Sequence, residues 1–210
     1  MVRTLVIDTA TAACSVALID GGAVIARLHE TVGRGHAEKL VPMIAALPDG
    51  GRAPHILVDC GPGSFTGVRV GLAAARGLAL GWGASLSGYS STALIAAATF
   101  AARPTLAQLA VVLEGGHGEV FMQAFTAAPF AADGALGSFR PEAAMAVLAG
   151  RVAVGNGVWH LPLAVDGGAD EVLPDAADAR LLPAEWAALP PSPIYGRAPD
   201  AKTLAERGLA

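Results

Sequence analysis

Cysteine and charge are both scarce in this sequence, and each scarcity argues against a class of protein. The two cysteines, Cys14 and Cys60, are far apart and match no Cys-x-x-Cys spacing, so we expect buried free thiols rather than a disulfide or a metal site. Charged residues make up 15% of the chain, and the formal net charge is −4 with no basic run. This balance argues against strong unaided binding of nucleic acid.

Long apolar runs are also missing. No stretch reaches the roughly 18 residues of a membrane span without Arg, Asp or a Gly/Pro break, so we expect no membrane partner. The start, residues 1–8, runs straight into an apolar strand and lacks the pattern of a signal peptide, which predicts a cytoplasmic protein. At 210 residues the chain fits one large domain or two small lobes.

A glycine-rich turn, Gly61-Pro62-Gly63-Ser64-Phe65-Thr66-Gly67, joins a predicted strand at residues 55–59 to a long predicted helix at residues 67–82. Ser64 and Thr66 are natural N-cap residues, and the glycines permit close backbone approach. A Walker loop needs Lys-Ser/Thr where Val68-Arg69 stands, and the dinucleotide fingerprint needs Gly or Ala at Thr66. Both motifs fail, which leaves a capped turn that binds nothing or a turn with a ligand or partner role.

The order of predicted elements indicates an α/β fold. We expect strands at residues 2–8, 14–19, 23–31, 55–59, 84–88, 107–113, 119–125 and 151–154, and helices at residues 37–47, 67–82, 91–102, 143–148 and 184–189. Meander, helix, strand, helix, strand, helix is the order of a ribonuclease-H-like lobe of the actin, sugar-kinase and chaperone-ATPase type. We therefore predict such a lobe at residues 1–103, and a smaller second lobe with an irregular tail at residues 104–210.

Asp8 ends the first strand and is followed by Thr9 and Thr11. In the ribonuclease-H-like fold this position faces the phosphate site, so these three residues are a candidate nucleotide corner. The alternative is that Asp and Thr only stabilise the turn through side-chain to backbone hydrogen bonds.

Small residues form a stripe on the helix after the glycine turn, because Gly67, Gly71, Ala75 and Ala79 recur every four residues. The stripe permits close packing against the chain's own sheet or against a helix of another subunit. Under the second hypothesis the helices at residues 37–47 and 67–82 form a partner surface. Its predicted residues are His36, Leu40, Ile44, Gly67, Arg69, Gly71, Leu72, Ala75, Arg76 and Ala79.

Signals for catalysis are weak. No two of the five histidines have the i, i+4 spacing that places both on one helix face, and Leu40 stands four residues after His36. No Gly-x-Ser-x-Gly nucleophile motif occurs, since Gly63-Ser64 is followed by Phe-Thr-Gly. We therefore assign no catalytic residue and no metal site from the sequence.

Six motifs stand in a characteristic order along the chain, namely Ile7–Thr11, Cys14–Leu18, Gly33–Glu38, Gly61–Gly71, Gly118–Phe121 and Gly155–Gly157. In this order they resemble the TsaB (YeaZ) family of the bacterial tRNA threonylcarbamoyladenosine machinery over nearly the whole chain. The resemblance implies two ribonuclease-H-like lobes and a non-catalytic subunit that pairs with TsaD, the paralogue that transfers the threonylcarbamoyl group to the adenosine beside the anticodon. It also implies that TsaD or a second copy of the chain docks on the helices at residues 37–47 and 67–82.

The same resemblance implies further partners and cofactors. TsaE joins the complex, tRNA is contacted mainly through the complex, and ATP or ADP and metal are expected on partner subunits, with no cofactor required by this chain. The alternative is an enzyme of the same superfamily, either a weak ATPase that uses Asp8 and the glycine turn, or a metallopeptidase-like hydrolase.

Overall fold

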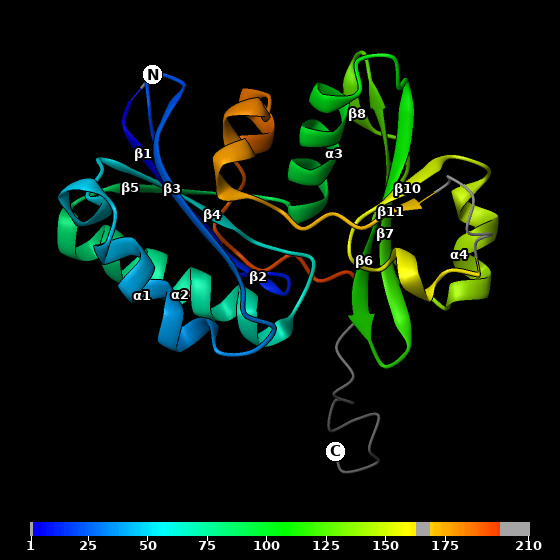
Figure 1. The fold of residues 1–210 in the computed structure, drawn as a ribbon, viewed down its shortest axis with the longest axis horizontal. Coiled ribbons are helices and arrows are strands. Elements are labelled where there is room, and N and C mark those ends of the chain that lie inside the picture. The colour runs from blue at the N-terminus through cyan, green and yellow to red at the C-terminus, as the bar shows by residue number, and fades with distance from the viewer. Residues whose placement is uncertain (1, 163–168, 198–210) are drawn as a thin grey trace, which may run out of the picture.

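The computed structural model describes residues 2–162 and 169–197, which form two β-sheets with helices on their faces. Figure 1 shows the two sheets side by side, with helix α3 (Ser91–Ala102) standing between them. No helix in the described part of the chain is long and apolar enough to cross a membrane.

The first sheet has five strands in the order β3-β2-β1-β4-β5. They are β1 (Thr4–Asp8), β2 (Ala13–Asp20), β3 (Ala23–Thr31), β4 (His55–Asp59) and β5 (Ser85–Tyr89). The first three form an antiparallel meander, and β4 and β5 extend the sheet in parallel with β1. The predicted order of meander, helix, strand, helix, strand and helix is confirmed.

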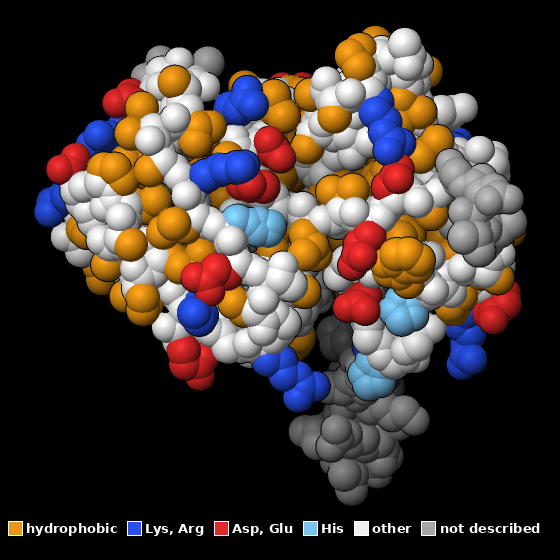
Figure 2. Space-filling view, in the orientation of Figure 1, with side chains coloured by type: hydrophobic (Ala, Val, Ile, Leu, Met, Phe, Trp, Pro, Cys, Tyr) orange, Lys and Arg blue, Asp and Glu red, His pale blue; other side chains and the backbone are white. Residues whose placement is uncertain are grey.

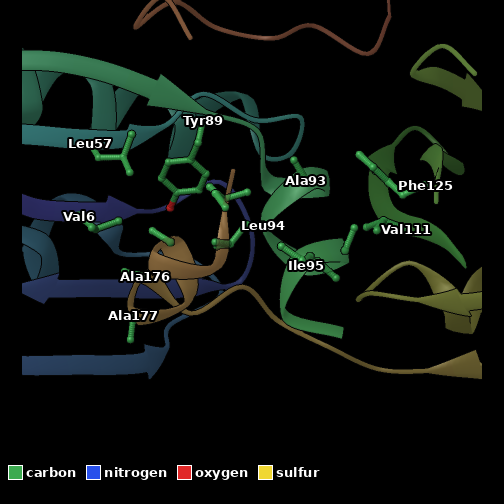
Figure 3. Packing of buried hydrophobic residues seen from close by; sticks show 14 of the residues in the cluster. Val6, Leu57, Tyr89, Ala93, Leu94, Ile95, Val111, Phe125, Ala176 and Ala177 are labelled. Atoms are coloured by element: carbon green, nitrogen blue, oxygen red, sulfur yellow. The ribbon is translucent and has the colours of Figure 1, made fainter. Parts of the chain in front are cut away.

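Helices cover both faces of this sheet. Alternate side chains of β1 point to opposite faces, so Leu5 and Ile7 pack with α1 (His36–Ala45) and α2 (Phe65–Trp82), whereas Val6 packs in a second cluster with α3. Figure 3 shows the second cluster, in which the Tyr89 ring lies between the first sheet and the short helix that carries Ala176 and Ala177. Both faces of the central strands are therefore buried, which explains their continuous apolar sequences.

The second sheet has six strands in the order β11-β10-β6-β7-β8, with β9 also paired to β7. They are β6 (Gln108–Gly116), β7 (Glu119–Ala127), β8 (Phe130–Ala132), β9 (Gly137–Phe139), β10 (Val152–Val154) and β11 (Ala169–Asp170). Helix α4 (Pro141–Leu148) packs on one face through Ala144 and Leu148. The other face meets α3 through Leu109, Val111 and Phe125, so α3 belongs to the core of both lobes.

After the second sheet the chain returns to the first lobe. The 3-10 helix η3 (Ala176–Leu181) packs on β1, β2, β3 and α3, and Leu189 forms a bridge with Gly88 beside β5. Two further 3-10 helices, η1 (Pro48–Gly51) and η4 (Ala184–Ala187), contact the first lobe, and η2 (Val158–His160) follows β10. The sheets separate at the predicted boundary near residue 103, but part of the predicted second domain lies on the first sheet. The domain division itself stays a prediction.

Several boundaries agree with the sequence prediction, namely those of β3, β4 and α3. The predicted helix at residues 184–189 is instead a shorter 3-10 helix, and β8, β9, β11 and η3 were not predicted. The last part of the predicted tail, residues 198–210, lies outside the described residues.

Candidate functional site

The glycine turn packs directly on the loop that follows β1. The Ser64 N–H donates to the Ala10 carbonyl (2.6 Å), and a Cβ added at Gly63 would overlap that carbonyl oxygen. A Cβ at Gly67 would likewise overlap the Thr9 carbonyl oxygen. The glycines are needed because backbone occupies the space where side chains would lie. The loop after β1 therefore lies where an anion held by this turn would have to approach.

The start of α2 is capped as expected. Ser64 is the N-cap residue, and its side chain accepts a hydrogen bond from the Gly67 N–H (3.2 Å). Thr66, the other candidate, lies inside the first turn of the helix. At the opposite end, Gly83 adopts a left-handed conformation with φ of 67°, which ends the helix.

The candidate nucleotide corner lies inside the protein. The exposed fraction is 0% for Asp8, 1% for Thr9 and 5% for Thr11. Asp8 accepts from the Tyr89 hydroxyl (2.8 Å), and the Thr9 hydroxyl donates to the Gly67 carbonyl (2.7 Å). The turn-stabilising alternative therefore describes Asp8 and Thr9. Only Thr11 of the three lines an open cavity.

Asp8 has an acidic neighbour, because Asp59 ends the adjacent strand β4 and is also buried. Asp59 accepts from the Gly61 N–H (2.7 Å) and from the Ser91 hydroxyl (2.7 and 2.9 Å). Burial raises the pKa of both carboxyls, and the nearby Asp8 charge raises the pKa of Asp59 further. Two carboxyl groups this close in a buried site do not both ionise readily, so the pair titrates as one coupled unit.

Most of the predicted partner surface faces the chain's own sheet. His36, Leu40, Ile44, Gly67, Gly71, Leu72 and Ala75 are all buried within the chain, and Ala79 is partly buried. A Cβ on Gly71 would lie 2.5 Å from the Thr9 hydroxyl oxygen, because α2 crosses closely over the end of β1. The prediction of a partner face is therefore corrected for these buried residues. The stripe of small residues lets α2 pack closely against the first sheet of the same chain.

The two predicted arginines are exposed but engage the last described segment of the chain. The Arg69 guanidinium stacks on Phe65, 3.1 Å from the ring centroid, and donates to the Tyr195 hydroxyl (3.0 Å). Arg76 donates to the Pro191 carbonyl (2.8 Å). Both side chains thus tie residues 191–195 to α2.

A different face of α1 and α2 is open to solvent, and sequence reasoning missed it. Val41 is 59% exposed and Leu80 is 87% exposed, and no atom lies within 4 Å of a Cβ added at Gly77 or Gly81. We call this surface the α1–α2 face, and it comprises Val41, Ala45, Ala73, Gly77, Leu80 and Gly81. Ala73, Gly77 and Gly81 also recur every four residues, so the sequence carried a second small-residue signal on the outer side of α2.

A cleft of about 1040 Å³ lies between the two lobes. The glycine turn, the loop after β1 and residues 193–197 form one side, and the β6–β7 hairpin, Phe121, Asn156 and His160 form the other. Two carboxylates line the cleft, and each has a partner. Glu114 Oε1 lies 3.3 Å from His160 Nε2, and Glu119 Oε2 lies 3.2 Å from Arg197 Nη1. Hydrogen bonds from Ser138 and Arg197 lower the pKa of Glu119.

Positive charge does not gather on the face drawn in Figure 2, where the Lys and Arg side chains are dispersed among apolar and acidic ones. This pattern agrees with the formal net charge of −4. Among the described residues, no three or more His, Cys, Asp or Glu side chains are grouped to hold a metal ion. His36 Nε2 instead lies 2.9 Å from the Thr11 carbonyl and 3.1 Å from the Ala13 carbonyl.

Comparison with known proteins gives consistent matches. The family model described as TsaD, tRNA N6-adenosine threonylcarbamoyltransferase, matches residues 27–137, more than half of the chain. The tRNA threonylcarbamoyladenosine biosynthesis protein TsaB of Escherichia coli is 38% identical over 124 residues, which are 57% of this chain and 53% of that protein. The matched part thus spans about half the length of this curated relative.

Solved structures cover more of the chain. YeaZ from Pseudomonas aeruginosa has a TM-score of 0.75 and 26% identity, covering 93% of this chain and 100% of that chain. A Pseudomonas aeruginosa protein described as similar to the peptidase YeaZ has a TM-score of 0.78 and 26% identity, covering 94% and 100%. These likenesses confirm the predicted two-sheet α/β fold of the actin-like type. The chain therefore belongs to the family that the TsaD model describes and, within it, to the TsaB (YeaZ) proteins.

Proposed function

We propose that this chain is a non-catalytic accessory subunit of tRNA threonylcarbamoyladenosine biosynthesis and that it pairs with TsaD through the α1–α2 face. The observation that carries the proposal is this solvent-exposed, apolar and small-residue face in a chain whose relatives are named for that process. The relative named TsaB identifies the process, and the exposed residues of α1 and α2 identify the surface.

The α1–α2 face suits docking of helices. Leu80 and Val41 offer apolar area, and burying such a side chain contributes about 1.5–3 kcal/mol. Gly77 and Gly81 have open space where a side chain would be, so a partner helix can approach the α2 backbone closely. Face residues Ala45 and Ala73 are exposed and also small. We propose that a second copy occupies the same face when TsaD is absent.

The buried acids support a subunit without chemistry of its own. A weak ATPase would use Asp8 toward phosphate, but Asp8 is fully buried and bonded to Tyr89. A metallopeptidase-like site would need grouped ligands, and the described residues hold no such group. We therefore propose that ATP or ADP and metal bind on the partner subunits, and that this chain requires no cofactor.

Two further partners follow from the family. We propose that TsaE joins the complex, and that tRNA is contacted mainly through the complex rather than by this chain alone. The acidic net charge and the dispersed Lys and Arg side chains in Figure 2 support the second point, because nucleic-acid affinity depends strongly on clustered positive charge.

Co-purification with TsaD of the same organism tests the pairing. Ala73→Glu and Leu80→Asp place a charge on the α1–α2 face, and we expect each to abolish the complex while the isolated chain stays folded. Ala146→Glu is the matched control, because Ala146 is an exposed helical alanine in the other lobe. The proposal is wrong if the unmodified chain forms no complex, or if both face variants bind TsaD as well as the control does.

A further inference from the structure

Two serines of β5, the last strand of the first sheet, flank His55 of the neighbouring strand β4. The two strands are parallel, and His55 is in register with Ser85. Ser87 comes two residues later in β5 and therefore lies on the same face of the sheet. We propose that Ser85 is a nucleophile activated by His55 and that it accepts an acyl group from a small activated donor, namely an aryl ester or an acyl phosphate.

The positions of the three side chains fit a nucleophile, its base and a group that orients the base. Ser85 Oγ lies 2.8 Å from His55 Nδ1, within the roughly 2.6–3.2 Å that separates a serine nucleophile from its base. On the other side of the ring, His55 Nε2 lies 3.1 Å from Ser87 Oγ. Because each ring nitrogen has a hydroxyl partner, the imidazole is held in one orientation.

The hydroxyl groups also assign the tautomer of His55. The Ser87 hydroxyl donates to the Ala187 carbonyl of η4 (2.9 Å), so Ser87 Oγ is left to accept from the His55 Nε2–H. His55 Nδ1 is then unprotonated and accepts from the Ser85 hydroxyl. The competing acceptor, the Pro54 carbonyl, is 3.3 Å from Ser85 Oγ and already accepts from the Ser85 N–H (3.0 Å). Ser87 is therefore a positioning residue that acts through His55.

The surroundings of the cluster decide which donors can react. Ser85 is exposed, so a donor can approach it, whereas His55 and Ser87 are half-buried. Burial lowers the pKa of His55 below its ordinary value of 6.5, so the ring is neutral at pH 8 and can take a proton. Ser87 is uncharged, unlike the aspartate of a serine-protease triad, and stabilises the imidazolium less. We therefore expect reaction with donors that have a good leaving group and not with amides.

The reaction is one acyl transfer to the chain. Ser85 Oγ attacks the carbonyl carbon of the donor, and His55 Nδ1 takes the hydroxyl proton. The bond to the leaving group breaks, and its electron pair departs with the phenolate or the phosphate. His55 then gives its proton to solvent, and an ester of Ser85 remains. The product is a modified chain, so the reaction needs no turnover and is compatible with a non-catalytic subunit.

Peptide mass spectrometry of the full-length chain after incubation at pH 8 tests the proposal. The donors are p-nitrophenyl acetate and acetyl phosphate, and the quantity measured is the rate at which each side chain gains an acetyl group. We expect Ser85 to be acetylated faster than Ser192, which is exposed but has no hydrogen bond to a histidine in the described part of the chain. Acetylation of the exposed Lys39 amine serves as the reference for reagent strength.

Variants assign the role of each residue. Ser85→Ala should remove the acetyl group from its peptide, and His55→Gln should slow acetylation of Ser85 about a hundredfold, because glutamine takes no proton. Ser87→Ala should also slow the reaction, and Ser87→Thr should restore it because threonine keeps the hydroxyl. Ser192→Ala is the matched control and should leave the rate at Ser85 unchanged.

Nitrogen NMR of the unmodified chain gives a second readout that needs no variant. Protonated and bare imidazole nitrogens differ in chemical shift, and at pH 8 we expect His55 to carry its proton on Nε2 and to leave Nδ1 bare. Ser87→Ala should weaken this preference, whereas Ser192→Ala should not. A proton on Nδ1 would overturn the proposal, since Ser85 would then have no base.

Three kinetic results would also overturn it. Ser85 could be acetylated no faster than Ser192, His55→Gln could react at the unmodified rate, or Ser87→Ala could match the Ser192→Ala control in both rate and tautomer. Loss of TsaD pairing alone would change none of these measurements, because Ser85 is outside the α1–α2 face. Ser85 also does not line the interlobe cleft.

Discussion

Two glycines of α2, Gly71 and Gly77, should respond in opposite directions when each is replaced by alanine. Alanine stabilises a helix interior by about 0.5–1 kcal/mol relative to glycine, so both variants gain this amount. At Gly77 nothing lies within 4 Å of the added Cβ, and the gain is uncompensated. We expect Gly77→Ala to be more stable than the unmodified chain by about 0.5–1 kcal/mol.

At Gly71 the added Cβ would lie 2.5 Å from the Thr9 hydroxyl oxygen, a distance that real Cβ atoms essentially never show. That hydroxyl is buried and donates to the Gly67 carbonyl (2.7 Å), so it cannot move without breaking the bond. Overpacking costs about 1–3 kcal/mol, and loss of a buried hydrogen bond costs about 1 kcal/mol more. After the helix gain is subtracted, Gly71→Ala should lose about 1–3 kcal/mol.

Urea unfolding of the isolated chain, followed by circular dichroism, measures both changes. The midpoint should rise for Gly77→Ala and fall for Gly71→Ala, with the denaturant slope unchanged in both. In thermal unfolding, each kcal/mol corresponds to about 2–4 °C for a chain of this size. If the two variants shift the midpoint equally, or if Gly71→Ala matches the unmodified chain, α2 does not face the sheet as described.

Two further outcomes concern the buried acids and thiols. The pKa of Asp59 is raised well above 3.8 in the folded state, so its stabilising contribution is present below pH 3.8 and is lost as the pH rises through the folded-state pKa. Asp59→Asn should therefore be more stable than the unmodified chain by a margin that grows from pH 4 to pH 8. A constant margin in urea unfolding would contradict this prediction. Burial raises the pKa of the free thiol of Cys14 to about 11 and that of Cys60 to about 12. A disulfide reagent at pH 8 should therefore label neither thiol in the native chain and both thiols in denaturant. Rapid labelling of the native chain would show that one thiol is exposed.

Local signals sufficed for much of the first lobe. The Asp20–Gly22 turn and the glycine turn clearly mark the ends of neighbouring elements. The strands beside them, β3 and β4, have the predicted bounds. Buried free thiols were also predicted correctly for both cysteines. In these places the sequence pattern and the fold agree because neighbouring residues determine the structure.

The inner side of α2 could not be assigned from the sequence. Small residues recur every four positions on two sides of this helix, at Gly67, Gly71 and Ala75 and again at Ala73, Gly77 and Gly81. Which side meets the sheet is decided by contacts with the Thr9–Ala10 loop, which is distant in the chain. The open face that we propose for TsaD was therefore missed, although its spacing was present.

Contacts across the whole chain were also beyond local reasoning. The Asp59 neighbour of Asp8 comes from a strand about fifty residues away. Thr11 and Asn156 line the same cleft only because the two lobes fold together. A short polar turn such as residues 155–157 carries no sign of what will lie opposite it.

The return of the chain to its first lobe has a consequence for synthesis on the ribosome. The Ala176 N–H donates to the Ser15 hydroxyl (2.9 Å) across a sequence separation of 161 residues, and Arg27 forms an ion pair with Asp175 (2.9 Å). Domains generally fold in order from the N-terminus as the chain emerges. Here the part of the buried face that η3 covers stays open until residues 176–181 have left the exit tunnel, so a nascent chain stopped near residue 170 carries an unfinished first lobe with exposed apolar surface.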